Sequence, residues 1–306
     1  MYSPIALFTY ERLDILKKTI NCLKKNSLSS KTDLYIFSDG PKDKLNSKNV
    51  KEVRLYLNSV TGFKSVKIIK RKINIGLERN LIQGMEYIFK NHERVIVLED
   101  DIATSKYFLK YLNDALNEYE NAKNVCQVTG YSFLEKYSKK YDLDDLYFIK
   151  GADCLAWGTW KDRWDLFTND ASSLSTEISK NKLISKFNRD NNYNYFKMLL
   201  DKSRQKNNSW AICWYAKNFL ENKYTLYPLK SLARHLGNDI SATNYIPSKN
   251  DSLEVKIQEQ SIKVKNIPIY EKINTFKAYN EFLKRSKGNF FERVKCFLKV
   301  KIRQVL

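Results

Sequence analysis

Short apolar runs alternate with longer amphipathic stretches through the first third of the chain. The apolar runs show little polar alternation and cover residues 5–8, 34–37, 66–69 and 95–98. Such a run predicts a strand that is buried on both faces, as in a parallel sheet. The intervening stretches repeat apolar residues at helical spacing. This alternation predicts an α/β fold, with an open, mostly parallel sheet flanked by helices and right-handed crossovers.

The pattern becomes less regular in the second half of the chain. The stretch 168–208 is polar and rich in Asn, Ser and Lys, with one expected helix around Tyr195, and it resembles an insertion or a flexible arm. We found no internal repeat. Further helices are expected at 107–119 and 209–220, and further strands at 125–129 and 224–228.

The strand at 95–98 ends in three adjacent carboxylates, Glu99, Asp100 and Asp101. Ligands of open α/β sheets bind at the carboxyl ends of strands, so these side chains are candidates for a site. Their mutual repulsion is costly unless a cation or several donors offset it. Carboxylate oxygens suit Mg²⁺ or Mn²⁺, which often complete their coordination with substrate phosphates. The alternative is a solvated acidic loop, or an N-cap for a helix that begins near Ser105.

Polar residues also follow the other predicted strands. Tyr10 and Arg12 occupy the turn after the first strand. Asp39 follows the second strand and precedes a Gly-Pro pair, which forces a turn there. Arg79, in the helix that follows the third strand, or Lys72 before that helix, would add a second positive group to this edge of the sheet.

The composition points to an anionic partner. The 306 residues carry a formal net charge of +20 at pH 7, which is typical of proteins that meet nucleic acid, a membrane surface or phosphorylated substrates. Five widely spaced cysteines indicate neither a disulfide framework nor a zinc site. No apolar run approaches the ~18 residues of a membrane span, and no signal peptide is evident at the amino terminus. We therefore expect a cytoplasmic protein.

Tryptophans recur at two places in the second half of the chain. Trp157, Trp160 and Trp164 lie within eight residues, next to small residues that permit close backbone approach. One interpretation is an aromatic platform for a sugar ring, and the other is packing in the core. The spacing favours the core for Trp164 and leaves both interpretations open for Trp157. With Trp210 in the helix at 209–220, Trp157 is our candidate acceptor contact.

Seven short motifs together resemble bacterial nucleotide-sugar-dependent glycosyltransferases of the GT-A fold. The likeness is to enzymes that share features with N-acetylglucosaminyltransferase I and to family 2 sugar transferases, and it extends from Pro4 to about Asn244. Each motif is weak alone, whereas their order and spacing together are more specific. The motifs are Phe8 to Arg12, Phe37 to Pro41, Asn74 to Leu77, Val97 to Ile102, Ala156 to Trp160, Ser209 to Trp214 and Ser231 to Gly237.

The resemblance implies roles for the strand-end residues. Arg12 and Asp39, with Tyr10 beside them, would hold the nucleotide of a nucleoside diphosphate sugar, with UDP as the expected nucleotide. The triplet stands where the family has an Asp-x-Asp element, so Asp101 would bind the Mn²⁺ or Mg²⁺ cofactor. Glu99 and Asp100 would face the donor sugar and the ribose, and a divalent metal would stabilise charge on the leaving diphosphate.

The catalytic base does not transfer from the resemblance. N-acetylglucosaminyltransferase I carries acidic residues in the segment that resembles Ser209 to Trp214, whereas this chain has only apolar residues and a cysteine between its tryptophans. An inverting displacement needs a carboxylate near the acceptor hydroxyl. Asp153 is our first candidate and Asp239 our second. His235 would contact the pyrophosphate or metal, or else serve a structural purpose.

The tail from Phe276 onward changes character again. Apolar residues from Phe290 to Val305 interleave with Arg and Lys, and on a helix they form one apolar and one basic face. Such a helix can lie on the inner face of an anionic membrane, which would make the protein peripheral there. The alternative is a terminal helix that docks on the core.

These observations predict a metal-dependent, inverting glycosyltransferase that acts on a surface glycan such as lipopolysaccharide or capsule, including lipid-linked forms. Residues 1–130 would bind the donor, 131–250 would bind the acceptor and supply a closing loop, and 251–306 would form a C-terminal helical extension. We expect no nucleic-acid partner, although the charge and the many aromatic residues keep a nucleic-acid-binding protein as an alternative. A catalytically inactive sugar-binding relative is the third possibility.

Overall fold

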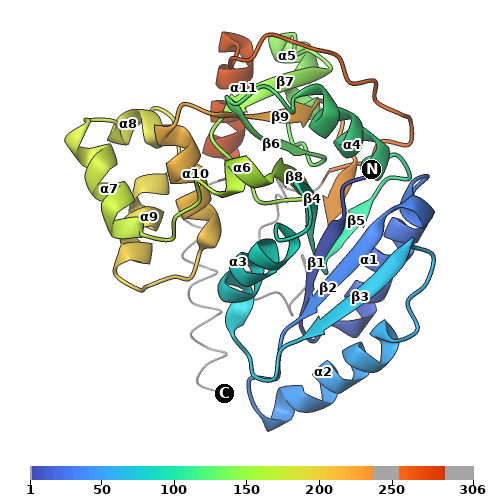
Figure 1. Ribbon diagram of the computed structural model, residues 1–306. Coiled ribbons are helices and arrows are strands. Elements are labelled where there is room, and N and C mark those ends of the chain that lie inside the picture. Colours follow the sequence, from blue (N-terminus) through green and yellow to red (C-terminus); the bar gives the residue numbers. More distant parts are fainter. Residues whose placement is uncertain (1, 237–254, 287–306) are drawn as a thin grey trace.

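The computed structural model describes residues 2–236 and 255–286, and an eight-stranded sheet forms its centre (Figure 1). The first four strands lie side by side in the order β3-β2-β1-β4, and all of them are parallel. Their carboxyl ends therefore meet at one edge of the sheet. These strands are β1 (Ile5–Thr9), β2 (Asp33–Ser38), β3 (Ser65–Lys70) and β4 (Arg94–Glu99).

The other half of the sheet is mixed. After β4 the order continues β8-β6-β9-β7, in which β6 and β9 are parallel to each other while β8 and β7 run antiparallel to their neighbours. The predicted α/β fold with an open, mostly parallel sheet is confirmed, and its arrangement is consistent with a GT-A architecture. The strands are β6 (Val125–Thr129), β7 (Leu146–Lys150), β8 (Trp157–Trp160) and β9 (Tyr224–Pro228).

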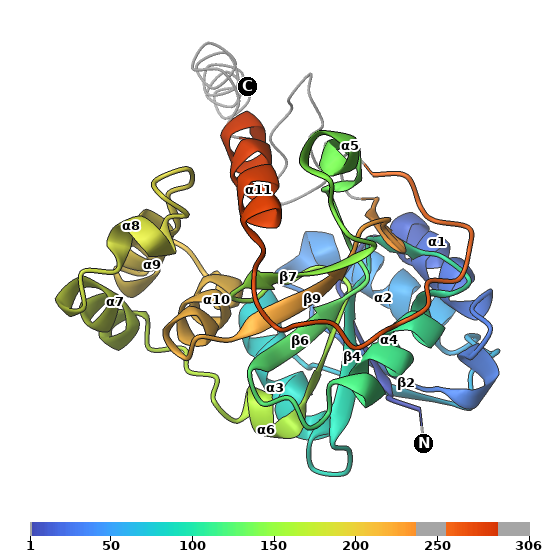
Figure 2. The same ribbon diagram turned by 90° about the horizontal axis from the view of Figure 1, so that it is seen from above.

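Helices cover both faces of the sheet because each presents one apolar stripe to it (Figures 1 and 2). One face is covered by α1 (Leu13–Lys24), α2 (Lys44–Leu57), α4 (Phe108–Glu118) and α11 (Ile273–Ser286). The opposite face is covered by α3 (Gly76–Ile88), α6 (Lys161–Trp164) and α10 (Trp210–Leu220).

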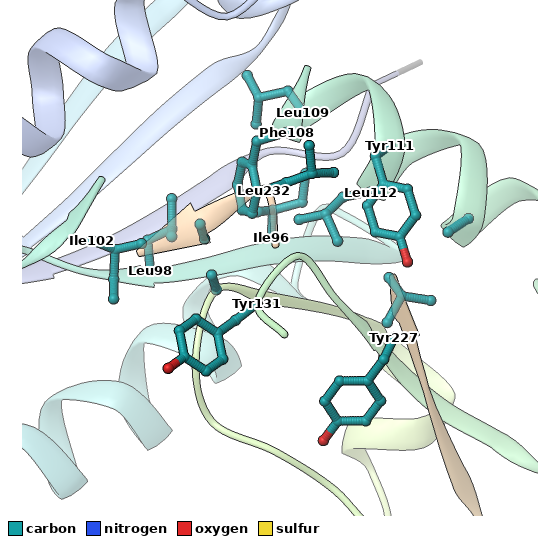
Figure 3. Close-up of a cluster of buried hydrophobic side chains, with 14 of the residues drawn as sticks. Ile96, Leu98, Ile102, Phe108, Leu109, Tyr111, Leu112, Tyr131, Tyr227 and Leu232 are labelled. Atoms are coloured by element: carbon teal, nitrogen blue, oxygen red, sulfur yellow. The ribbon is translucent and has the colours of Figure 1, made fainter. Parts of the chain in front are cut away.

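The apolar side chains of β4 pack on both faces of the sheet. Ile96 and Leu98 belong to the core on the α4 side, whereas Val95 and Val97 belong to the core on the α3 side. Figure 3 shows Ile96 and Leu98 beneath the apolar side chains of α4. Because no side chain of this run faces water, the sheet fixes the place where the strand ends and its acidic triplet begins.

The polar stretch 168–208 folds into three short helices. They are α7 (Ala171–Lys180), α8 (Ile184–Phe187) and α9 (Tyr195–Ser203), and they pack with α10 around a small apolar cluster of their own. The predicted helix around Tyr195 is confirmed. The expectation of a flexible arm was wrong, because Ile178, Phe187 and Leu199 bury enough apolar surface to order the insertion.

After the undescribed residues 237–254, the chain crosses the α4 side of the sheet as an extended strap, residues 255–272 (Figure 2). The Tyr119 hydroxyl, at the end of α4, donates to the Lys265 carbonyl and accepts from the Ile267 amide, both at 3.0 Å. A short α5 (Ser138–Tyr141) contacts α11 at the end of this strap. The predicted amphipathic helix from Phe290 onward lies outside the described residues.

Arg189 joins the helical insertion to the strap. Its guanidinium makes two bonds to the Glu271 carboxylate, at 2.8 and 2.5 Å, and it lies over the rings of Phe276 and Tyr279. Both charged side chains are largely buried. Among the described residues, no helix is both long enough and apolar enough to cross a membrane.

Glu271→Ala should destabilise the fold by about 3 to 5 kcal/mol, because it leaves the buried Arg189 guanidinium without its counter-ion. Urea denaturation at pH 7 measures this loss of unfolding free energy. Glu221→Ala is the matched control: it breaks the more exposed Lys217–Glu221 pair, which should cost no more than about 1 kcal/mol. Equal effects of the two substitutions would contradict the assigned role of the buried pair.

Candidate active site

The acidic triplet emerges at the carboxyl edge of the four parallel strands, where β4 ends beside β1. Glu99 is the last residue of β4 and pairs in register with Phe8 of β1. Asp100 and Asp101 follow in a turn and are both buried. Carboxylates at this edge occupy the place where open α/β sheets bind ligands.

Asp100 is tied to the turn between β1 and α1. Its Oδ2 accepts from the Thr9 hydroxyl at 2.9 Å and from the Tyr10 amide at 3.1 Å, and its Oδ1 accepts from Arg12 at 2.8 Å. The Thr19 hydroxyl also donates to the Asp100 carbonyl. Burial raises the pKa of Asp100, although the Arg12 charge opposes that rise. This carboxylate has little freedom to reorient.

The two carboxylate oxygens of Asp101 differ in their hydrogen bonds. Oδ2 accepts from Arg12 at 2.7 Å and lies 3.2 Å from His235 Nε2, whereas Oδ1 is buried and has no hydrogen-bond partner among the described residues. Burial raises the pKa of Asp101, but the bonds from His235 and Arg12 outweigh burial and lower it. Asp101 is therefore held as a carboxylate with one free oxygen.

His235 reaches the triplet through a second, two-stranded sheet. In it β10 (Ala233–His235) pairs antiparallel with β5 (Ile102–Thr104), which places His235 opposite Ile102. The Leu236 amide then donates to the Asp101 carbonyl at 2.6 Å. The structure thus brings His235 together with Asp101, although 134 positions separate them in the sequence.

The site gathers three neighbouring carboxyl groups. Burial, followed by the charges of Asp101 and Asp100, raises the pKa of Glu99 to about 8. The charges of His235 and Arg12 oppose that rise. Among the described residues, no group of three or more His, Cys, Asp or Glu side chains is arranged to hold a metal ion. A cation here would need further ligands from a substrate or from water.

Asp39 lies at the end of β2 and is buried. Its Oδ1 accepts from the amides of Gly40 and Ile75 at 2.8 and 3.0 Å, and its Oδ2 accepts from the Gly76 amide at 3.0 Å. Asp39 therefore caps the start of α3 from a different part of the chain, whereas an N-cap residue usually comes directly before its own helix. A Cβ on Gly76, which has a φ of +78°, would meet nothing within 4 Å. The space on that side of Gly76 is therefore open.

Tyr10 and Arg79 border the same edge. The Tyr10 hydroxyl accepts from the Lys42 amide at 3.2 Å, which links the β1 turn to the segment that follows β2. Arg79 is exposed in the first turn of α3. The expected donor-binding residues therefore lie around one strand edge, while Arg12 makes its described bonds with the acidic triplet.

Arg54 is a supporting residue that the sequence did not reveal. From α2 its guanidinium donates to the carbonyls of Asp39 at 3.0 Å and Arg71 at 2.7 Å, and it holds together the ends of β2 and β3. Thr9 and Thr19, which fix Asp100, were also missed. Charged and hydroxyl residues are frequent in this chain, and their partners lie on other elements, so nothing local distinguishes them.

Asp153 lies in the loop between β7 and β8. Its Oδ1 accepts from the Cys154 amide at 2.6 Å, and its Oδ2 accepts from the Tyr227 hydroxyl at 3.0 Å. Burial raises the pKa of Asp153. After burial, the charges of Asp153 and Glu99 further raise the pKa of Cys154, which indicates that this loop lies close to the triplet. Asp239, the second candidate, lies outside the described residues.

The tryptophans do not form an open platform. Trp157 is 0% exposed and Trp210 is 4% exposed, and their rings stack at 5.7 Å within a cluster that includes Trp164 and Trp214. Trp157 is part of β8, between β4 and β6, so its ring has no free face for a sugar. This placement departs from the expected acceptor contact, and it agrees with core packing for Trp164. The spacing alone could not show that β8 lies inside the sheet.

No family model matches the chain, and no curated protein sequence matches it. Solved structures align over part of it. S. aureus TarS 1–349 in complex with UDP-GlcNAc is 16% identical over 42% of this chain and 34% of that chain, with a TM-score of 0.33. The mannosyltransferase PcManGT from Pyrobaculum calidifontis, in complex with GDP-Man and Mn²⁺, is 8% identical over 54% and 47%, with a TM-score of 0.38.

An active-site mutant of LgtC is 14% identical over 58% of this chain and 64% of that chain, with a TM-score of 0.35. The aligned part spans less than two thirds of the length of each of these structures. Identities of 16% or less and TM-scores below 0.5 assign neither a family nor a function to the chain. The residues of the site itself therefore have to carry the functional conclusion.

Trp157→Ala should lower the unfolding free energy by about 3 to 5 kcal/mol, because it removes a fully buried indole and leaves a cavity among the other tryptophans. Thermal and urea denaturation measure this effect. Wild-type stability combined with weakened acceptor binding would instead restore Trp157 as an acceptor contact.

Proposed function

We propose that the protein is a metal-dependent glycosyltransferase that uses a nucleoside diphosphate sugar as donor. The observation that carries the proposal is the buried Asp101 Oδ1, which has no partner among the described residues and lies beside Glu99 and Asp100 at the sheet edge. A buried carboxylate oxygen without a donor is costly. A bound cation removes that cost.

The residues fit a hard divalent ion. Mg²⁺ and Mn²⁺ prefer oxygen ligands and are commonly held by one or two carboxylates together with substrate phosphates. Asp101 would supply the protein ligand through Oδ1, with His235 and Arg12 fixing its other oxygen. When bound, the ion would supply positive charge that stabilises the leaving diphosphate.

Asp39 supports a uridine nucleotide. A carboxylate has about four lone-pair positions, and three of those on Asp39 accept from backbone amides. The remaining position, on Oδ2, accepts from no described residue. A uracil ring offers an imide N–H that suits such an acceptor. Tyr10, Arg12 and Arg79 would contact the rest of the nucleotide, and Glu99 and Asp100 would face the ribose and sugar.

Asp153 is the proposed catalytic base for an inverting transfer. Its carboxylate would accept the proton of the acceptor hydroxyl while the acceptor oxygen bonds to the sugar anomeric carbon and the bond to the diphosphate breaks. The Tyr227 hydroxyl orients the carboxylate, and the raised pKa makes Asp153 a better proton acceptor than an exposed aspartate. The proposed acceptor is a surface glycan, such as lipopolysaccharide or capsule, and the transferred sugar is a hexose or an N-acetylhexosamine.

Calorimetric titration of UDP tests the metal assignment. Affinity should rise when Mn²⁺ is added to the wild-type protein, and Asp101→Ala should abolish that rise because Oδ1 is lost. Asp114→Ala is a matched control, since Asp114 is paired on the surface with Lys110 in α4. Metal-enhanced affinity that survives in Asp101→Ala would exclude Asp101 as the metal ligand.

Asp153→Asn should slow sugar transfer by ~10² to 10⁴-fold, because a positioned general base typically contributes that much. UDP affinity and the melting temperature should stay near their wild-type values. Asp144→Asn serves as the control, because Asp144 is exposed and paired with Lys272. Turnover is followed as diphosphate nucleotide released from a panel of nucleotide sugars with a glycan acceptor, and wild-type turnover would eliminate Asp153 as the base.

A further inference from the structure

Large apolar side chains are exposed around the edge of the sheet that carries the acidic triplet. Leu45 is 88% exposed, Ile73 is 70% exposed and Leu77 is 44% exposed. Leu45 and Ile73 are the most exposed large apolar residues in the described part of the chain. Single exposed leucines are ordinary, but several on neighbouring segments indicate an interaction surface. We name these three side chains the donor-edge patch.

The two segments that carry the patch are bonded to each other. One follows β2 and leads into α2, and the other follows β3 and leads into α3 (Figure 1). The Asn74 side chain donates to the Gly40 carbonyl at 3.0 Å, and Asp39 accepts from the amides of Ile75 and Gly76. A Cβ on Gly40 would come within 2.3 Å of the Ile73 carbonyl carbon, so the backbones are in contact. The patch therefore lies on one connected rim.

The same rim is rich in exposed cations. Among its carboxylates, Asp39 is buried, Asp43 caps α2 through the Asn46 amide at 2.9 Å, and Glu78 is bonded to the side chains of Lys202 and Asn169. Asp39 and Glu78 are therefore withdrawn from solvent and Asp43 is exposed, while the exposed charge of the two segments is mainly positive. The exposed cations of the two segments are Lys42, Lys44, Lys48, Lys72 and Arg79.

We propose that the donor-edge patch and its lysines dock on an anionic membrane surface. Protruding aliphatic side chains surrounded by Lys and Arg match an interface in which chains insert shallowly and cations meet lipid headgroups. A protein partner of ordinary composition would not require this excess of exposed lysines. Docking by this rim turns the carboxyl edge of the parallel strands, with Asp100 and Asp101, toward the bilayer.

The docking itself is independent of the enzymatic activity. Its consequence for catalysis rests on the proposed function: a donor site held against the bilayer would use an acceptor that is itself anchored in the membrane. A soluble glycan would gain nothing from such an orientation.

Co-sedimentation of the full-length protein with vesicles of phosphatidylglycerol and phosphatidylcholine tests the proposal. The double variant Leu45→Ser with Ile73→Ser should reduce partitioning onto these vesicles at least tenfold. The matched control is Leu55→Ser with Ile273→Ser, which removes two apolar side chains of similar exposure, 62% and 63%, away from the rim. Leu55 lies on the same helix as Leu45 but about 15 Å further along it, toward the opposite edge of the sheet.

The charge component has its own variants. Lys44→Gln and Lys48→Gln should each weaken binding about fivefold, because each nearby lysine adds on the order of 1 kcal/mol of attraction to an anionic surface. Their effects should shrink as salt screens the surface and vanish on pure phosphatidylcholine.

Partitioning of the Leu45→Ser, Ile73→Ser protein that equals that of the control would overturn the proposal. Failure of the wild-type protein to bind the anionic vesicles would also overturn it. So would light scattering that shows a dimeric wild-type protein and a monomeric double variant, because the patch would then be a dimer interface. UDP titration and thermal melting of the same samples keep the result separate from the proposed function. Loss of vesicle binding with intact melting supports the patch even if no nucleotide binds.

Discussion

The ion pairs of Arg12 with Asp100 and Asp101 are the interaction on which the candidate site depends. They join the turn after β1 to the turn after β4, at 2.8 and 2.7 Å, and so fix two strand ends that are adjacent only in the folded sheet. Charge-assisted bonds of this kind orient carboxylates more strictly than neutral bonds do. The rest of the edge, including His235 on β10, is arranged around these carboxylates.

A single cation cannot serve three carboxylates equally. Arg12 contacts Asp100 and Asp101 but makes no described bond to Glu99, and burial together with the charges of Asp101 and Asp100 raises the pKa of Glu99 to about 8. His235 adds a partner for Asp101 Oδ2, while Oδ1 stays buried and accepts from no described residue. The folded protein therefore holds an electrostatically costly arrangement in place through the rigidity of its sheet, which is the condition under which a site is preorganised for a charged ligand.

The sequence predicted the sheet more reliably than the helices. β1, β2 and β4 were found because buried parallel strands need continuous apolar runs, and β3 was found although it is a partly exposed edge strand. In contrast, α2 was missed because its buried Val50, Val53 and Leu57 are separated by many lysines and polar residues. β8 was also missed, since Trp157 and its neighbours contain a glycine and little β-branched content. Two of the three helices of the insertion, α7 and α8, depend on contacts between elements rather than on any strong periodicity of their own.

The residues of the candidate site also fall into two groups, those that the sequence predicted and those that it did not. Residues that follow directly after a strand, such as Asp39 and Asp101, were predictable because the end of a parallel strand has a known place in the fold. Residues that act across elements were not: Arg54 reaches the ends of β2 and β3 from a helix, and Thr19 reaches the Asp100 carbonyl from α1. The burial of Trp157 likewise follows from strand order, which no local pattern encodes.

The Asp39 carboxylate has a structural role in the fold and a proposed role in the site. By accepting three backbone amides it fixes the start of α3 and the rim above it, and one acceptor position is not used by any described residue. Substituting this carboxylate would therefore disturb the rim together with the proposed nucleotide contact. Asp153, whose oxygens are held by Cys154 and Tyr227 rather than by the rim, offers a cleaner separation of chemistry from structure.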